Sequence, residues 1–241
     1  MPTARATFSP DLGETRGILI TRPYEAARRT ARRVEALGWQ PVIAPCLDIV
    51  VLEINDRPDV DAVLVTSGNA LLSTCHGYQS VPLLAVGDAT APDARSLGFR
   101  DVQSAGGDAD ALADLAATTL PPGAHLLLPV GEGQGERLAA TLNAAGFEVH
   151  RRVAYRAEPP RIFPPAAAEA LHARRLRAAT FLSAETARAF ARLMPIGLRY
   201  LLASVDALAI SESAAAALNP LPWRRVRVSA SPTLDGILAL L

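Results

Sequence analysis

The chain repeats a strand–turn–helix pattern, and this repeat limits the possible folds more than any other feature of the sequence. Residues 17–51 begin with a short apolar strand, continue into an amphipathic helix that Gly38 ends, and finish as an extended segment. Residues 125–159 follow the same course, and Gly146 ends their helix. Because Gly38 and Gly146 lie 108 residues apart, the sequence predicts two related units.

The repetition continues to the C-terminus. AVLVTSGNAL corresponds to ATFLSAETARAF at an offset of 116, and LLAVGDATAPDARSLG corresponds to ALAISESAAAAL at an offset of 124. Loop insertions produce such a slowly growing offset. Because strands alternate with helices in both halves, 17–118 and 124–241, we expect parallel sheets with helices on both faces. The predicted fold class is α/β, with two doubly wound, flavodoxin-like domains.

Polar turns follow the predicted strands, and each one leads into a predicted helix. They are Thr21-Arg22-Pro23, Thr66-Ser67-Gly68-Asn69, Gly87-Asp88-Ala89-Thr90, Val130-Gly131-Glu132-Gly133, Ser183-Ala184-Glu185-Thr186 and Ser211-Glu212-Ser213. Open parallel sheets bind ligands beyond the carboxyl ends of their strands, and the free N–H groups of a helix start suit a carboxylate. The alternative is N-capping, in which Ser67, Asn69, Thr186 and Ser211 only satisfy the helix ends.

The composition excludes several kinds of chemistry. All 24 basic residues are arginines, so neither a Walker-type phosphate loop nor a lysine Schiff base can form. Cys46 and Cys75 form no CxxC motif, and the four histidines show no metal-ligand spacing, so we expect no metal site.

The formal net charge is zero and gives no reason to expect a nucleic acid or a membrane as partner. Residues 1–16 lack the apolar region of a secretory signal, and no apolar run reaches the length of a membrane span. We therefore expect a cytoplasmic protein with a loose N-terminal tail at 1–16.

Acidic and basic residues gather in different parts of the sequence. Residues 53–115 contain ten acidic residues and three arginines, whereas residues 137–177 contain eight arginines and three acidic residues. Opposite electrostatic fields could steer an anionic ligand toward the basic part. The alternative is an ordinary solvated surface.

Taken in order, the motifs resemble uroporphyrinogen-III synthase. The order is TRP–helix–G, VTSGNAL, AVGDATA–helix–LG, LLLPVGE–helix–AGF, VAYR, FLSAETARAF and a final AI–S/T–helix segment, over nearly all of 17–241. The resemblance implies two HemD-like domains joined by a two-stranded β-ladder hinge. One domain would comprise 17–45 and 158–241, the other 53–149, with 46–52 and 150–157 as crossover linkers. The contiguous halves of the repeat are compatible with this if the first strand–helix unit of each half packs with the other half.

The resemblance also implies a reaction. Members of the family act on hydroxymethylbilane, a linear tetrapyrrole with eight carboxylates. They expel its terminal hydroxyl, invert the last pyrrole ring through a spiro intermediate and close the macrocycle without a metal or an organic cofactor. A hinged pair of domains could close over the substrate. We expect a monomer that could receive its substrate by transient handover from hydroxymethylbilane synthase.

Site residues are carried over from the matching motifs. Tyr155 in VAYR would be the catalytic residue that donates a proton to the leaving hydroxyl, since a phenol is a better acid than base at neutral pH. Substrate contacts would come from the polar turns, namely Arg22, Thr66, Ser67, Gly87, Thr90, Gly131, Ser183 and Ser213. For Tyr155, the alternative is an ordinary half-buried strand residue.

The sequence departs from the family pattern at three turns. AISESAAAAL stands where family members usually show a glycine and then a threonine pair; Ser213 can replace one hydroxyl but Ala214 cannot replace the other, and Glu212 adds negative charge. Gly68 and Val130 replace the more usual serine or proline and arginine. These departures leave open a catalytically impaired HemD-like paralogue that acts as a tetrapyrrole- or anion-binding sensory module. A flavodoxin-like redox or nucleotide protein is a third reading, but no GxGxxG follows the first strand and aromatic residues are few.

Overall fold

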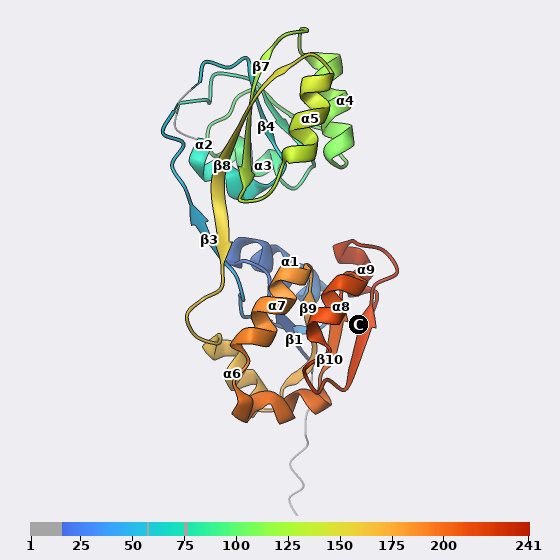
Figure 1. Cartoon of the computed structure of the whole chain (residues 1–241). Coiled ribbons are helices and arrows are strands. Elements are labelled where there is room, and N and C mark those ends of the chain that lie inside the picture. Colours follow the sequence, from blue (N-terminus) through green and yellow to red (C-terminus); the bar gives the residue numbers. More distant parts are fainter. Residues whose placement is uncertain (1–15, 57, 75–76) are drawn as a thin grey trace, which may run out of the picture. The chain divides into compact units, whose positions relative to one another are not determined.

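The chain folds into two compact units, each with its own sheet (Figure 1). The computed structural model describes residues 16–56, 58–74 and 77–241. Unit 1 combines Met1–Asp48 with Pro159–Leu241, and unit 2 is the contiguous segment Ile49–Glu158. Apart from Arg16, the predicted N-terminal tail lies outside the described residues.

Unit 1 contains a five-stranded sheet in the order β11-β10-β9-β1-β2, with every neighbouring pair parallel. Its strands are β1 (Gly17–Ile20), β2 (Gln40–Ile43), β9 (Leu176–Phe181), β10 (Asp206–Ala209) and β11 (Arg225–Val228). Its helices are α1 (Tyr24–Ala36), α6 (Pro165–His172), α7 (Ala184–Leu193), the 3-10 helix η2 (Ile196–Ser204), α8 (Glu212–Leu218) and α9 (Leu234–Leu238). None of the helices in the described part of the chain is long and apolar enough to cross a membrane.

Helices cover both faces of this sheet because its strands are apolar on both sides. On one face, Ala27 and Val34 of α1 and Ile237 of α9 pack against Ile18 and Leu208. Alternation along β9 directs Phe181 to the other face. There its ring packs edge-on against Phe190 of α7 and Trp223, with centroids 5.2 and 5.7 Å apart.

Unit 2 contains a six-stranded sheet in the order β3-β8-β7-β4-β5-β6. Its strands are β3 (Asp48–Val51), β4 (Ala62–Val65), β5 (Leu83–Ala85), β6 (Val102–Ser104), β7 (His125–Gly131) and β8 (Glu148–Glu158). Its helices are the 3-10 helix η1 (Gly68–Ala70), α2 (Leu71–Thr74), α3 (Ala91–Ser96), α4 (Ala109–Thr119) and α5 (Glu136–Ala144). One face of the sheet packs on α2 and α3, and the opposite face packs on α4 and α5 (Figure 1).

The strand orders locate a switch point in each sheet. In unit 1 the chain builds outward from β1 to β2 and then continues on the other side with β9, so the switch point lies between β1 and β9. In unit 2 the chain builds from β4 to β5 and β6 and then returns to β7, so the switch point lies between β4 and β7. The predicted class, α/β with two doubly wound parallel sheets, is confirmed. In such sheets, ligands bind outside the carboxyl ends of the strands at the switch point.

Candidate functional site

In unit 2, the predicted residues lie at the carboxyl edge of the sheet. Thr66 and Ser67 follow β4 and Gly131 ends β7, so these three flank the switch point. Tyr155, on the next strand, is in register with Gly131. Gly87 and the nearby Thr90 follow β5, on the other side of β4, and complete the unit 2 set.

A β-bulge determines the direction of Tyr155. The register between β7 and β8 shifts after Val130 pairs with Val153, and Gly131 then pairs with Tyr155, so Ala154 is the additional residue. Without the bulge, alternation would direct Tyr155 toward α4 and α5. With it, Tyr155 joins the cluster that packs on α2 and α3. Bulges of this kind redirect side chains near functional sites.

The loop after β7 surrounds the Tyr155 ring. Tyr155 is 5% exposed, and its hydroxyl donates a 3.3 Å hydrogen bond to Oε1 of Gln134. A Cβ at position 131 would lie 2.9 Å from the Tyr155 Cζ and 3.0 Å from the Gln134 side chain, so only glycine allows this close packing. Arg151 Nε donates a 2.7 Å hydrogen bond to the Gln134 carbonyl and anchors the loop. Gln134 is not among the residues predicted from the sequence, and the only signal for it there is its place between two glycines, Gly133 and Gly135.

In the polar turns of unit 2, one hydroxyl caps a helix, whereas two others form no hydrogen bond with the described residues. Ser67 is an N-cap, because its Oγ accepts a hydrogen bond from Asn69 N–H. Thr66 is half-buried and Thr90 is buried. Among the described residues, neither hydroxyl has a hydrogen-bonding partner. Thr90 N–H donates to the Gly87 carbonyl. The Thr66 and Thr90 hydroxyls are therefore the groups of this edge that can bind a ligand without losing a bond.

In unit 1, Arg22 follows β1 and Ser183 follows β9, so the two flank the switch point of that sheet. Ser183 is an N-cap: its Oγ accepts from Thr186 N–H at 3.0 Å and bonds to the Thr186 hydroxyl at 2.8 Å. Thr21 is buried and donates to the Thr180 carbonyl at 2.7 Å. The cap of α7 is therefore Ser183 and not Thr186, which the capping alternative named. The Thr21 hydroxyl stabilises the sheet through its bond to β9.

Arg22 is the cation at the unit 1 switch point. Its Nη1 donates a 3.1 Å hydrogen bond to the Thr30 hydroxyl, and no described carboxylate forms an ion pair with it. Burial, with a smaller contribution from the positive charge of Arg29, lowers the pKa of Arg22. A half-buried cation without a carboxylate partner gains most from an incoming anion.

The hydroxyls of the turn between β10 and α8 bond within the turn itself. Ser211 caps α8 by accepting from Ala214 N–H, and its Oγ lies 3.0 Å from the Ser213 Oγ. Ala214 is fully buried, whereas Glu212 and Ser213 are exposed. The turn therefore offers one exposed hydroxyl beside a carboxylate.

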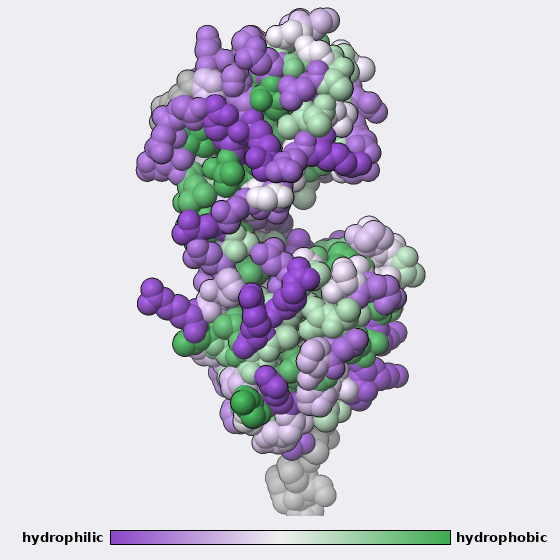
Figure 2. All heavy atoms as spheres, in the orientation of Figure 1, coloured by the Kyte–Doolittle hydropathy of each residue, from purple (hydrophilic) through white to green (hydrophobic). Residues whose placement is uncertain are grey.

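Most arginines of the predicted basic region have acidic partners. The pairs are Arg137–Asp110, Arg151–Glu136, Arg152–Asp56, Arg156–Glu158, Arg175–Glu169 and Arg177–Asp206. Arg152 Nε donates to both Asp56 oxygens at 2.9 Å, and this bonding lowers the pKa of Asp56. Figure 2 shows hydrophilic and apolar atoms interspersed over the visible surface of both units. The pairing supports the solvated-surface alternative.

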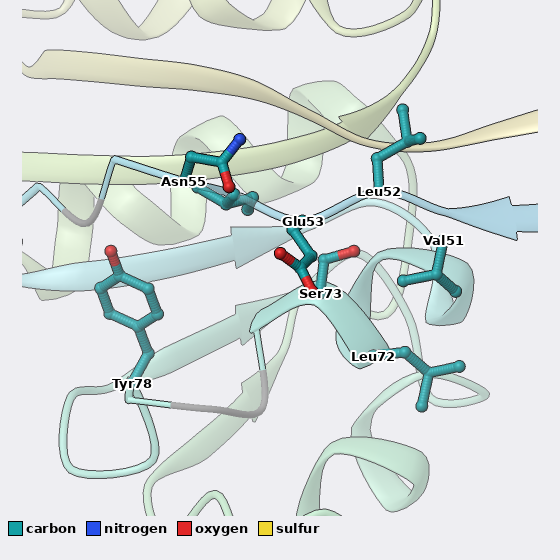
Figure 3. Close-up of a pocket in the computed structure, with 8 residues that line it drawn as sticks. Val51, Leu52, Glu53, Asn55, Leu72, Ser73 and Tyr78 are labelled. Atoms are coloured by element: carbon teal, nitrogen blue, oxygen red, sulfur yellow. The ribbon is translucent and has the colours of Figure 1, made fainter.

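A cavity of about 390 Å³ lies beside β3 in unit 2. Its lining residues are Val51, Leu52, Glu53, Ile54, Asn55, Leu72, Ser73 and Tyr78, and Glu53 and Ser73 project into the same space (Figure 3). Ser73 donates a 2.5 Å hydrogen bond to the Ala154 carbonyl, so the cavity adjoins the bulge that positions Tyr155. The carboxylate of Glu53 makes this wall unsuitable for a polyanionic ligand.

Comparisons with known proteins give the family of the chain and the likeness of its fold. The family model described as uroporphyrinogen-III synthase HemD matches residues 28–239. The crystal structure of uroporphyrinogen-III synthetase from Helicobacter pylori 26695 is similar, with a TM-score of 0.62 and 17% identity over 93% of this chain and 97% of that chain. The Thermus thermophilus uroporphyrinogen III synthase gives a TM-score of 0.42 and 20% identity over 92% of this chain and 96% of that chain. None of the curated proteins matches the chain. Since the family model spans most of the sequence, the chain belongs to the uroporphyrinogen-III synthase HemD family.

Proposed function

We propose that the chain is a uroporphyrinogen-III synthase, a cyclising hydro-lyase that needs no cofactor. It would convert hydroxymethylbilane into the macrocycle with inversion of the last pyrrole ring and loss of water. The family match over residues 28–239 carries the proposal. The position of Tyr155 supports it, because the only polar group of this side chain lies at the carboxyl edge of the unit 2 sheet, next to its switch point.

The reaction needs few catalytic groups from the protein. A pyrrole nitrogen of the substrate supplies the electrons that expel the terminal hydroxyl, and Tyr155 O–H donates the proton with which this hydroxyl leaves as water. The proton released from the pyrrole carbon when the macrocycle closes restores the phenol. In the free protein the phenol donates to Gln134, so the substrate hydroxyl would replace the Gln134 amide as its acceptor. Gln134 and Gly131 act as positioning residues for this ring.

The substrate carboxylates would bind to both units. At the unit 1 edge, Arg22 offers a cation without a carboxylate partner among the described residues. At the unit 2 edge, Thr66 and Thr90 offer unoccupied hydroxyls. Ser67, Ser183, Ser213 and the backbone at Gly87 and Gly131 complete the proposed set. Eight carboxylates on one flexible chain make such distributed contacts effective, because each restricts the linear substrate further toward a reactive geometry.

A coupled isomer assay tests the proposal. Hydroxymethylbilane is generated in situ, the protein is added, and the oxidised products are separated into type I and type III uroporphyrins by chromatography. Closure without the enzyme gives type I, so an excess of type III that scales with protein concentration is the expected result. Type I alone from correctly folded protein would exclude the synthase.

The second candidate is a HemD-like binding module without turnover. The turn between β10 and α8 favours it, because Ala214 is fully buried and Glu212 places a carboxylate beside Ser213. Such a protein would leave only type I product in the assay while still binding a linear or cyclic tetrapyrrole, measured by isothermal titration calorimetry. Production of type III would eliminate it.

Four further expectations stay predictions. They are the role of 46–52 and 150–157 as crossover linkers, the monomeric state, the cytoplasmic location and the handover from hydroxymethylbilane synthase. Light scattering coupled to size-exclusion chromatography tests the monomer directly. The same measurement on a mixture with hydroxymethylbilane synthase tests whether the two proteins form a lasting complex or only a transient one.

A further inference from the structure

Two histidines and a glutamate gather at the amino edge of the unit 2 sheet, opposite the edge that carries Tyr155. His125 begins β7, Glu148 begins β8, and the two are in register. His150 follows two residues later and pairs with Leu127. Because side chains alternate along a strand and paired residues share a face, all three side chains project from the same face of neighbouring strands.

The ligand atoms of this group face one another. The Nε2 atoms of His125 and His150 lie 3.6 and 3.8 Å from the two carboxylate oxygens of Glu148. All three ligand atoms lie within 4.8 Å of one another, and the imidazole rings are stacked with centroids 5.8 Å apart. Nε2 of His150 is buried without a hydrogen-bonding partner. A buried polar atom normally has a partner, so this nitrogen points to a missing ligand.

Backbone hydrogen bonds fix the position of the group, and nearby carboxylates favour the binding of a cation. Asp61 and His125 exchange two 2.8 Å hydrogen bonds, one from the Asp61 N–H to the His125 carbonyl and one from the His125 N–H to the Asp61 carboxylate. These bonds hold the start of β7 in place. The carboxylates of Glu148 and Asp61 are negatively charged, whereas the charge of Asp56 is balanced by its ion pair with Arg152. Side-chain exposures of 47% for His125 and 62% for Glu148 leave the group open to solvent on one side.

We propose that His125, Glu148 and His150 form a binding site for a divalent transition-metal ion, with zinc as the best fit. Two imidazoles and one carboxylate form a ligand set that zinc takes in proteins, with water in the fourth position. Ligands about 2.1 Å from a tetrahedral zinc lie about 3.4 Å apart. The two histidine–glutamate separations of 3.6 and 3.8 Å need to contract by a few tenths of an ångström, and no separation of the group, all being within 4.8 Å, needs to contract by more than about 1.4 Å. Copper and nickel also suit imidazole donors, and calcium and magnesium do not.

The site would join β7 to β8 at their amino ends. Its ion would therefore stabilise the strand pair that carries Gly131 and Tyr155 at its other end. A ligand that binds only the folded state raises stability in proportion to the logarithm of its concentration. The role assigned to the metal is structural, and it is independent of whether the chain is a synthase.

Titration of the untagged full chain with zinc chloride tests the proposal. Isothermal titration calorimetry should show one zinc per chain, and cobalt chloride should give the visible absorption of a low-symmetry site. His125→Ala and Glu148→Gln should each weaken zinc binding by more than about 10-fold. Loss of a residue that only hydrogen-bonds to a metal ligand already weakens metal binding by about 10–100-fold. His172→Ala is the matched control, because His172 is an exposed histidine on α6 of unit 1. Its variant should bind zinc like the parent chain.

Thermal unfolding gives an independent measurement. Zinc should raise the melting temperature of the parent chain and of His172→Ala, and it should leave that of Glu148→Gln unchanged. Both replaced ligands are exposed, so circular dichroism should show that the variants are folded. The proposal would be overturned if the parent chain showed no saturable zinc binding. It would also be overturned if His125→Ala and Glu148→Gln bound zinc as tightly as the parent chain.

Discussion

Ala154 and Tyr155 are consecutive in β8, yet both side chains contribute to the core that packs on α2 and α3. The bulge at Ala154 makes this possible, because it adds one residue to β8 between its pairs with Val130 and Gly131. Tyr155 is thereby placed over Gly131 and beside Gln134. The position of the proposed proton donor thus depends on an irregularity of the strand, and substitutions at several neighbouring residues should change it.

Replacing Tyr155 by phenylalanine should lower kcat by about 10²–10⁴-fold, the usual contribution of a positioned proton donor. KM should stay nearly unchanged, because the ring remains. The isomer assay should show less type III product and correspondingly more of the type I isomer, which forms without the enzyme. Loss of one hydrogen bond to Gln134 should lower the free energy of unfolding by only about 1 kcal/mol.

Tyr78→Phe is the matched control for this variant. Tyr78 is 7% exposed, belongs to the same core cluster, and donates its hydroxyl to the Pro58 carbonyl. It should lose a similar amount of stability and keep its turnover. If Tyr155→Phe turned over as fast as the parent chain, Tyr155 would have no part in the mechanism.

Replacing Gly131 by alanine should displace Tyr155, because the added Cβ would lie 2.9 Å from the Tyr155 Cζ. Overpacking of this kind costs about 1–3 kcal/mol of unfolding free energy, and kcat should fall with it. Gly197→Ala is the control, since no atom lies within 4 Å of the Cβ it would add. Urea unfolding and the isomer assay measure both effects; a Gly131→Ala variant as stable and active as Gly197→Ala would contradict the packing described.

Replacing Thr90 by valine should weaken substrate binding without weakening the fold. The Thr90 hydroxyl has no hydrogen-bonding partner among the described residues, so its removal breaks no bond and the free energy of unfolding should not fall. Loss of a bond to a carboxylate, worth about 1.5–3 kcal/mol, should raise KM by about 10–100-fold.

Ser211→Ala should show the reverse behaviour and serves as the comparison for Thr90→Val. Ser211 caps α8, so its loss should lower the free energy of unfolding by about 1 kcal/mol and leave KM unchanged. An unchanged KM for Thr90→Val would remove this hydroxyl from the proposed substrate contacts.

Cys46 should be unreactive in the folded protein. Burial raises its pKa from 9.0 to about 12, and the thiolate is the reactive form. With Cys75 replaced by serine, iodoacetamide near neutral pH should label Cys46 only in denaturant, as mass spectrometry would show. Rapid labelling of the native chain would contradict the burial of this thiol.

The same pKa shift predicts a dependence of stability on pH. Because the folded-state pKa of Cys46 lies above its unfolded value, its contribution to stability is complete below pH 9.0 and is lost as the pH rises toward 12. The urea midpoint of the parent chain should therefore fall more steeply over this range than that of Cys46→Ala.

The fold class could be predicted from the sequence, and so could the position of the polar turns of the candidate site at the strand ends. Apolar strands that run into helices at matching spacing leave little choice but parallel sheets, and the hydroxyl turns mark the strand ends. The capping alternative also holds for Ser67 and Ser211, whereas Asn69 and Thr186 donate their N–H groups to the actual caps, Ser67 and Ser183. In each cap, one oxygen atom satisfies a helix end, which local sequence alone determines.

Features that depend on strand register could not be predicted. Nothing in VAYR indicates that Ala154 is an additional residue, because a bulge arises from how β8 pairs with β7. Gln134 accepts a hydrogen bond from Tyr155, although the two lie 21 positions apart in the sequence. His125 and His150 are isolated in sequence and were expected to bind no metal, yet the pairing of their strands places them on one face.

The discontinuity of unit 1 determines the order in which the protein can fold during its synthesis. β1 lies between β2 and β9, and the Thr21 hydroxyl bonds to a carbonyl 159 residues later. All of unit 2 is translated between these partners. Unit 2 can therefore complete its sheet on the ribosome, whereas Ile18, Leu19 and Ile20 must wait for β9 to emerge. During that interval β1 is an apolar strand without its central partner, and we expect a chaperone to bind it.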